Sequence, residues 1–193
     1  MLRLMDNDIM VMLDGDDWLA SKLALWRVAE AYEDSAVLGT YGTYVYFPHG
    51  IVQPAPAFEP SVLRSSSFRR EQWISRLVQK GTVARLCVVC DSTVRSHLKT
   101  VRAWLWKELD RRDLYDNQTG RPWQMTGDQA IMFSLLELSG GCFRPIEAVT
   151  YVYNFVNPIS DFRKSEQIQL ESEKRIRSLT PRNPLVSKCL QPP

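Results

Sequence analysis

Three carboxylates stand together directly after an apolar run near the start of the chain. Residues 9–13 are all apolar, and Asp14-Gly15-Asp16-Asp17 follows them. Such a run is typical of a strand covered on both faces, and Gly15 allows a sharp turn just after it. Carboxylates at i and i+2 repel unless a cation lies between them, and hard oxygen ligands suit Mg²⁺ or Mn²⁺. We therefore expect Asp14 and Asp16 to hold a divalent cation that bridges to substrate phosphates.

Other motifs share part of this pattern. An EF-hand loop counted from Asp14 would need an acid at Trp18 and a glutamate at Leu25, and neither is present. Aspartyl-nucleophile phosphatases also place Asp-x-Asp after an apolar strand, but they continue with Gly and then Thr or Val where this chain has Asp17-Trp18. A turn rich in Asp and Gly is common between a strand and a helix. The Asp-x-Asp pattern alone therefore does not distinguish a surface turn from a cation site.

A second stretch places an acid at the start of a helix. Residues 126–138 predict a helix that Thr126 caps and that Gly140-Gly141 ends. Asp128 would lie in the first turn, where the helix dipole favours the charged carboxylate. A carboxylate that stays ionised at neutral pH suits a general base. The alternative is that Asp128 only stabilises the helix start, by a few tenths to about 1 kcal/mol.

Composition restricts the class of protein. The chain has 193 residues, of which 45% are hydrophobic and 24% charged, with a net charge of +2. One domain with a core is expected, and nucleic acid is not expected as a partner. The first residues lack the apolar centre of a signal peptide and no run is long enough to cross a membrane, so a cytoplasmic location is predicted. Cys87, Cys90, Cys142 and Cys189 are then expected to be reduced.

The elements that must position these acids alternate between strand and helix patterns. The strand-like stretches are 9–13, 36–47 with a return at 51–52, 82–90, and 143–154 with an interruption at Pro145. Helical patterns cover 17–34, 68–79, 101–109, 126–138 and 161–177. In the first of these, Asp17 or Ser21 is the expected cap, and Leu19, Leu23, Trp26 and Ala29 form the face expected to pack on the sheet. Residues 110–125 predict an exposed loop, and 179–193 a loose tail.

Several of these stretches, taken in order, resemble a GT-A glycosyltransferase of the family 2 type. The resemblance rests on Leu13-Asp14-Gly15-Asp16-Asp17-Trp18, Gly-Asp128-Gln-Ala, and Tyr151-Val-Tyr153-Asn154 with Asn157-Pro158. It also takes in residues 96–100 and 176–178. It implies a Rossmann-like mixed α/β sheet flanked by helices. It also implies metal-dependent, inverting transfer of a sugar from a nucleotide diphosphate to a glycan, protein or lipid hydroxyl.

The resemblance also implies roles for residues and a division of the chain. Asp14 and Asp16 would bind Mn²⁺ or Mg²⁺, Gly15 and Asp17 would complete the cofactor-binding loop, and Asp128 would be the catalytic base. Residues 1–178 would be the C-terminal portion of the catalytic domain, with an insertion at 74–95. The family's nucleotide-binding first strand should precede the acidic strand, so we expect an N-terminally truncated domain, associated with a chain that supplies the missing half. The alternative is a non-catalytic remnant or subunit that binds a nucleotide sugar or a partner chain.

Overall fold

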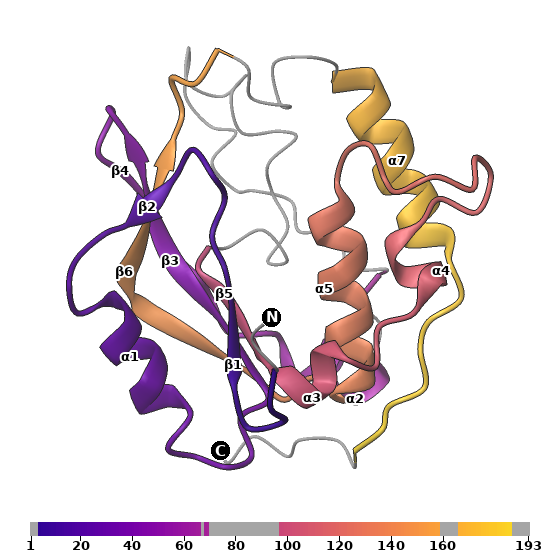
Figure 1. Cartoon of the computed structure of the whole chain (residues 1–193), viewed down its shortest axis with the longest axis horizontal. Helices are drawn as coiled ribbons and strands as arrows, with labels where there is room; N and C mark the ends of the chain where they lie inside the picture. Colours follow the sequence, from indigo (N-terminus) through magenta and orange to yellow (C-terminus); the bar gives the residue numbers. More distant parts are fainter. Residues whose placement is uncertain (1–3, 67, 70–96, 159–165, 187–193) are drawn as a thin grey trace.

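The computed structural model describes residues 4–66, 68–69, 97–158 and 166–186, and in them the fold is α/β with a six-stranded mixed sheet (Figure 1). The strand order is β1-β5-β3-β6-β2, with β4 added on β3. Strands β3 and β6 are parallel, and the other neighbouring pairs are antiparallel. The strands are β1 (Ile9–Met12), β2 (Trp18–Leu19), β3 (Gly39–Phe47), β4 (Ile51–Gln53), β5 (Lys99–Arg102) and β6 (Phe143–Asn154). The predicted mixed α/β class is confirmed at this level.

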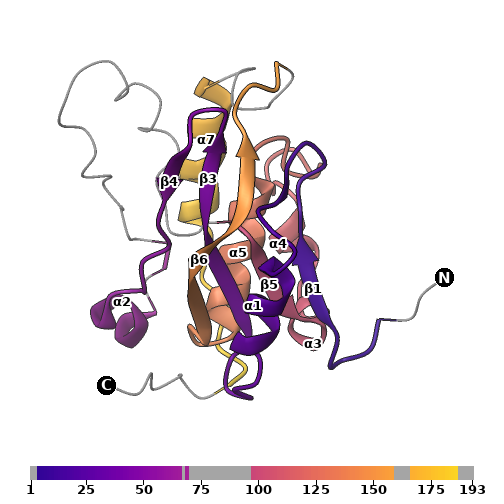
Figure 2. The same cartoon turned by 90° about the vertical axis from the view of Figure 1, so that its left-hand side faces the viewer.

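Helices lie on both sides of the sheet (Figures 1 and 2). Helix α1 (Ala24–Ala31) covers one side, where Val28 packs with Tyr44, Leu98 and Tyr151. The other side carries α3 (Ala103–Trp106), α4 (Arg111–Leu114), α5 (Gly127–Leu138) and α7 (Glu166–Ser178), while α2 (Pro60–Ser65) follows the β3–β4 hairpin. The sheet is thus the middle layer of a three-layer arrangement, as helices on both faces of an α/β sheet require.

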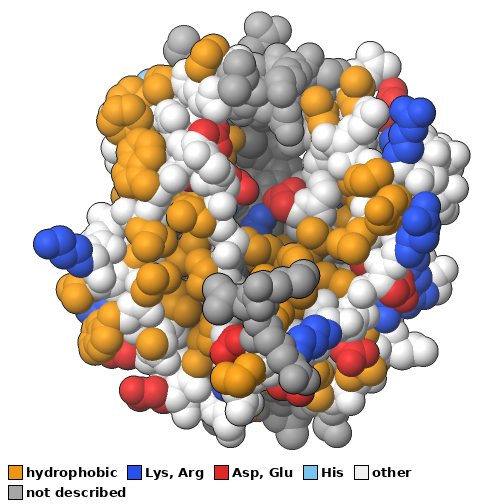
Figure 3. Space-filling model, viewed as in Figure 1, with side chains coloured by type: hydrophobic (Ala, Val, Ile, Leu, Met, Phe, Trp, Pro, Cys, Tyr) orange, Lys and Arg blue, Asp and Glu red, His pale blue; other side chains and the backbone are white. Residues whose placement is uncertain are grey.

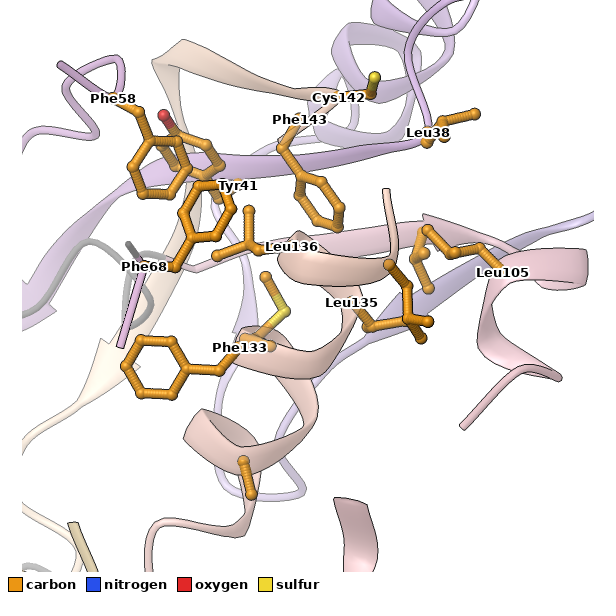
Figure 4. Close-up of a cluster of buried hydrophobic side chains, with 14 of the residues drawn as sticks. Leu38, Tyr41, Phe58, Phe68, Leu105, Phe133, Leu135, Leu136, Cys142 and Phe143 are labelled. Carbon is orange, nitrogen blue, oxygen red and sulfur yellow. The ribbon is translucent and has the colours of Figure 1, made fainter. Parts of the chain in front are cut away.

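The main core forms between the sheet and α5 (Figure 4). Phe133, Leu135 and Leu136 of α5 are fully buried and pack with Tyr41 of β3 and Phe143 of β6. Buried side chains occur all around α5, which is expected of a helix enclosed between other elements rather than lying at the surface. This packing fixes the position of the helix whose first turn carries Asp128.

Strand β1 is confirmed as a strand, but the expectation that both of its faces are covered is wrong. It ends the strand order and, among the described residues, pairs with β5 alone. Val11 is 39% exposed and Leu13 is 45% exposed. An unbroken apolar run shows that a strand packs somewhere, but it does not show which neighbours the strand will have.

The first helix is shorter than predicted and turns a different face to the sheet. Its buried residues are Ala24, Val28 and Ala31, whereas Leu23 and Trp26 are about half-exposed. Neither Asp17 nor Ser21 caps it, because the N-cap is Leu23 without a side-chain hydrogen bond. Apolar residues occur on two sides of this helix, so periodicity alone did not identify the buried one.

Three later segments also differ from prediction. Val101 and Arg102 belong to β5, not to a helix, because Val101 is fully buried between Met10 of β1 and Gly39 of β3. The predicted loop at 110–125 contains α4, which a capping box between Asp110 and Asp113 starts. Pro145 does not interrupt β6, which runs beside β3 with register irregularities near Gly42.

The segment after α7 is anchored, not loose, as far as it is described. The Arg182 guanidinium donates to Asp113 at 2.6 Å, and its backbone N–H donates to Glu137 at 2.9 Å. Glu137 also forms a buried ion pair with Arg69 at 2.6 Å. The predicted insertion at 74–95, the predicted strand at 82–90 and most of the predicted helix at 68–79 lie outside the described residues.

One of the four cysteines lies within the residues that the structure describes. Cys142 is disulfide-bonded, so the expectation of a reduced thiol is wrong for this residue. Cys87, Cys90 and Cys189 lie outside the described residues. No helix in the described part of the chain is long and apolar enough to span a bilayer.

Candidate functional site

The predicted site residues meet at one cavity. Asp14, Gly15, Asp16 and Asp17 lie on one wall and Asp128 on the other, around a volume of about 540 Å³. Figure 3 shows this hollow, with acidic side chains on both sides and a basic side chain between them. The loop after β1 and the start of α5 are far apart in the sequence, and the sheet and the core between them bring the two together.

The acidic loop is held by the end of β6. The Tyr151 hydroxyl donates to Asp17 Oδ2 at 2.6 Å, and the Asn154 backbone N–H donates to Asp17 Oδ1 at 2.7 Å. Both oxygens of Asp17 therefore accept hydrogen bonds from β6. Burial raises the pKa of the Asp17 carboxyl, and the two hydrogen bonds act in the opposite direction. Asp17 lines the cavity, but its contacts are those of a residue that fixes the loop.

The two remaining acids of the loop face the cavity with more exposure. Asp14 and Asp16 are both exposed residues. The chain around the Asp14 carboxyl partly desolvates it and raises its pKa, whereas the Lys99 charge lowers it. Asn157 Nδ2 donates to Asp16 Oδ2 at 2.5 Å. Gly15 lies between them, and a side chain would fit at this position, because an added Cβ would meet nothing within 4 Å. The turn therefore does not depend on glycine, contrary to expectation.

Two acids of the loop could hold a divalent cation only together with ligands from outside the described residues. Among the described residues no group of three or more His, Cys, Asp or Glu side chains can enclose a metal ion. Asp14 and Asp16 are two hard carboxylates among the residues that line the cavity. Mg²⁺ is commonly held by one or two carboxylates together with substrate phosphates and water rather than by a full protein cage. Asp14 and Asp16 could hold Mg²⁺ or Mn²⁺ in that way.

Asp128 lies in the first turn of α5, as predicted, but the helix starts differently. Thr126 is the N-cap in a left-handed conformation with φ of 59°, and its hydroxyl donates to the Met125 carbonyl, so the predicted side-chain cap is absent. The Asp128 side chain is 51% exposed, and its Oδ2 accepts a hydrogen bond from Lys99 Nζ at 2.6 Å. The carboxylate that the sequence suggested as a base is thus ion-paired with a buried lysine.

Aromatic side chains complete the cavity. Tyr44, Tyr46 and Tyr153 line it, and His97 stacks on the ring of Tyr151 with centroids 4.5 Å apart. Burial, with the nearby Lys99 charge, lowers the pKa of His97 to about 3, so its imidazole is neutral at physiological pH. These rings offer flat surfaces of the kind on which sugars and bases pack.

Trp123 of the segment before α5 lines the same cavity and is largely buried. Trp123 and Gln124 also line a second cavity of about 300 Å³, which extends toward Arg175 of α7. The two cavities are therefore neighbours that share this wall.

The sequence analysis gave no role to Lys99 or to the tyrosines of the cavity, although residues 96–100 and Tyr153 belong to the stretches that carry the family resemblance. Tyr44, Tyr46 and Tyr153 alternate along β3 and β6, a signal that places them on one face of the sheet without showing that the face borders a cavity. Lys99 lies in a short strand with no local pattern that marks it. Comparisons with known proteins add nothing to these assignments, because no family model, no curated protein and no solved structure matches the chain.

Proposed function

We propose that the cavity binds a nucleoside-diphosphate sugar and transfers the sugar to an acceptor hydroxyl, as a GT-A-like glycosyltransferase does. One observation supports this above the others: Asp14 and Asp16 face Asp128 across the same cavity. Two carboxylates on one wall provide a place for a cation and diphosphate, and a third on the opposite wall provides a place for a base. Inverting transfer needs both a cation site beside the leaving diphosphate and a base for the acceptor hydroxyl.

The proposed reaction balances with these residues. The acceptor hydroxyl gives its proton to the Asp128 carboxylate while its oxygen forms a bond to the anomeric carbon. The bond from that carbon to the diphosphate oxygen breaks, and its electron pair stays on the diphosphate. A divalent cation at Asp14 and Asp16 would stabilise this leaving charge as a Lewis acid. The Lys99 ammonium donates to Asp128 Oδ2 at 2.6 Å and so fixes where this carboxylate lies.

The chain's own residues also orient the ligands. Asp17 fixes the acidic loop to β6 through Tyr151 and Asn154, so Asp14 and Asp16 are presented at a defined place. Tyr46 and Tyr153 offer an aromatic wall for a sugar or base ring. The acceptor would be a glycan, protein or lipid whose hydroxyl reaches Asp128.

A second candidate is a non-catalytic protein that binds the nucleotide sugar or a partner chain. The observation that favours it is the Lys99–Asp128 ion pair, because an acid already engaged by a lysine is a weaker proton acceptor than an unpaired one. The two candidates share donor binding and differ in turnover, so a binding assay and a transfer assay together separate them.

Calorimetry with UDP and GDP, with and without Mn²⁺, tests the shared step. We expect wild type to bind at least one of these nucleotides only when Mn²⁺ is present, and Asp16→Ala to lose that binding, since each carboxylate is a large part of the ligand set. The control is Asp6→Ala, which removes an exposed acid paired with Lys107 and outside the cavity. Equal Mn²⁺-dependent affinity in Asp16→Ala and wild type would refute the metal assignment.

A further inference from the structure

A buried lysine lies next to one of the acids that line the cavity. Lys99 begins β5 and pairs in the sheet with Met12, the last residue of β1. Its side chain is only 4% exposed, and its Nζ lies 2.6 Å from Asp128 Oδ2. An ammonium removed from water is costly unless it is paired, so the fold tolerates Lys99 here because Asp128 pairs with it.

The charge of Lys99 acts on both walls of the cavity. On one side its ammonium contacts Asp128, and on the other Lys99 pairs in the sheet with Met12, two residues before Asp14. Among the described residues that line the cavity none is a lysine or arginine, and Asp16 and Asp17 add two more carboxyl groups to the acidic loop. Within the described part of the chain, Lys99 is therefore a cation placed to offset the negative charge of the acids at this cavity.

We propose that Lys99 is a positioning residue that holds Asp128 at the cavity wall and weakens divalent-cation binding at Asp14 and Asp16. The role in transfer rests on the proposed function, but the electrostatic effect on cation binding does not. A lysine that only supported the fold would lower stability on removal and would not strengthen the binding of any ligand. If Lys99 repels the bound cation, its removal should instead strengthen Mn²⁺ binding, because the carboxylates then keep their full negative charge.

A Mn²⁺ titration followed by electron paramagnetic resonance, without nucleotide, tests the inference. We expect Lys99→Met to bind Mn²⁺ on the order of 10-fold more tightly than wild type, because one repelling unit charge near the site is gone. Lys99→Arg keeps the charge and should bind as wild type does. Lys107→Met, which removes an exposed lysine paired with Asp6, is the surface control and should also leave the affinity unchanged.

Equal or weaker Mn²⁺ binding by a folded Lys99→Met variant would overturn the inference, as would the absence of Mn²⁺ binding in every variant. If Lys99→Met does not fold, Lys99→Gln gives the same comparison with a neutral side chain that can still donate to Asp128. The failure of the proposed function has a different signature: the Mn²⁺ affinities follow the expected order, but no nucleoside diphosphate binds and no sugar is transferred. Where transfer occurs, Lys99→Met should lower kcat without raising the donor KM, and Lys99→Arg should restore part of kcat.

Discussion

Replacing Asp128 with asparagine should destabilise the fold more than its place at a helix start suggests. The helix-dipole contribution alone is worth at most about 1 kcal/mol. The structure adds a second effect, because Asp128→Asn removes the anionic partner of the buried Lys99. Breaking a fully buried ion pair costs about 3–5 kcal/mol, whereas exposed pairs contribute about 0.2–1 kcal/mol. The Lys99 side chain is 4% exposed and the Asp128 side chain is 51% exposed, so solvent screens only one partner of this pair. The free energy of unfolding should therefore fall by about 1–3 kcal/mol, between the values for exposed and buried pairs.

The assay is denaturant unfolding followed by tryptophan fluorescence, and the chain supplies a matched control. Lys107 and Asp6 form a pair of the same chemistry at 2.7 Å, but with side chains that are 42% and 73% exposed. Asp6→Asn should therefore cost less than about 0.5 kcal/mol. If Asp128→Asn costs no more than Asp6→Asn, Lys99 does not depend on Asp128 and the electrostatic reasoning is refuted.

The same substitution tests the proposed base. Asp128→Asn keeps the size of the side chain and removes its ability to accept a proton, so transfer should fall by a factor on the order of 10² to 10⁴. Because Asp128→Asn also leaves the Lys99 charge unpaired, Mn²⁺-dependent donor affinity should fall on the order of 10-fold, which is less than the loss in transfer. Equal transfer by wild type and Asp128→Asn would show that the base lies elsewhere. Donor binding without any transfer by wild type would instead favour the non-catalytic candidate.

Two further predictions concern pH and self-association. Because the pKa of His97 is about 3 in the folded chain and near 6.5 when unfolded, its contribution to stability is complete above pH 6.5 and is lost as the pH falls toward 3, by about 1.4 kcal/mol per unit. His97→Phe should flatten this slope in unfolding experiments between pH 7 and 4.5; identical slopes in wild type and His97→Phe would contradict the assignment. The outer edge of β1, with Val11 exposed, should make the chain oligomeric or aggregation-prone in sedimentation experiments, and Val11→Lys should increase the monomer fraction. A well-behaved wild-type monomer at high concentration would count against this edge as an association site.

The amino-acid sequence by itself determined the elements whose signals are local. Helix α5 lies where the pattern from Thr126 to Gly141 predicts it, because an apolar run ended by two glycines needs no distant information. The β3–β4 hairpin is also as expected, since β-branched and aromatic residues flank a turn that contains Pro48 and Gly50. The acids after β1 and at the start of α5 could be chosen as site residues because their types and spacing carry chemical meaning.

Tertiary structure alone decided which residues meet. Lys99 has no sequence signal for its pairing with Asp128, because the contact depends on the placement of β5 beneath the start of α5. The structure likewise assigned Asp17 to the anchoring of the loop, through hydrogen bonds to residues of β6 that no local pattern indicates. The same physical reason explains why β1 was predicted correctly as a strand but incorrectly as covered on both faces: an apolar run reflects the tendency of side chains to leave water, whereas the neighbours that cover them are chosen by the packing of the whole chain.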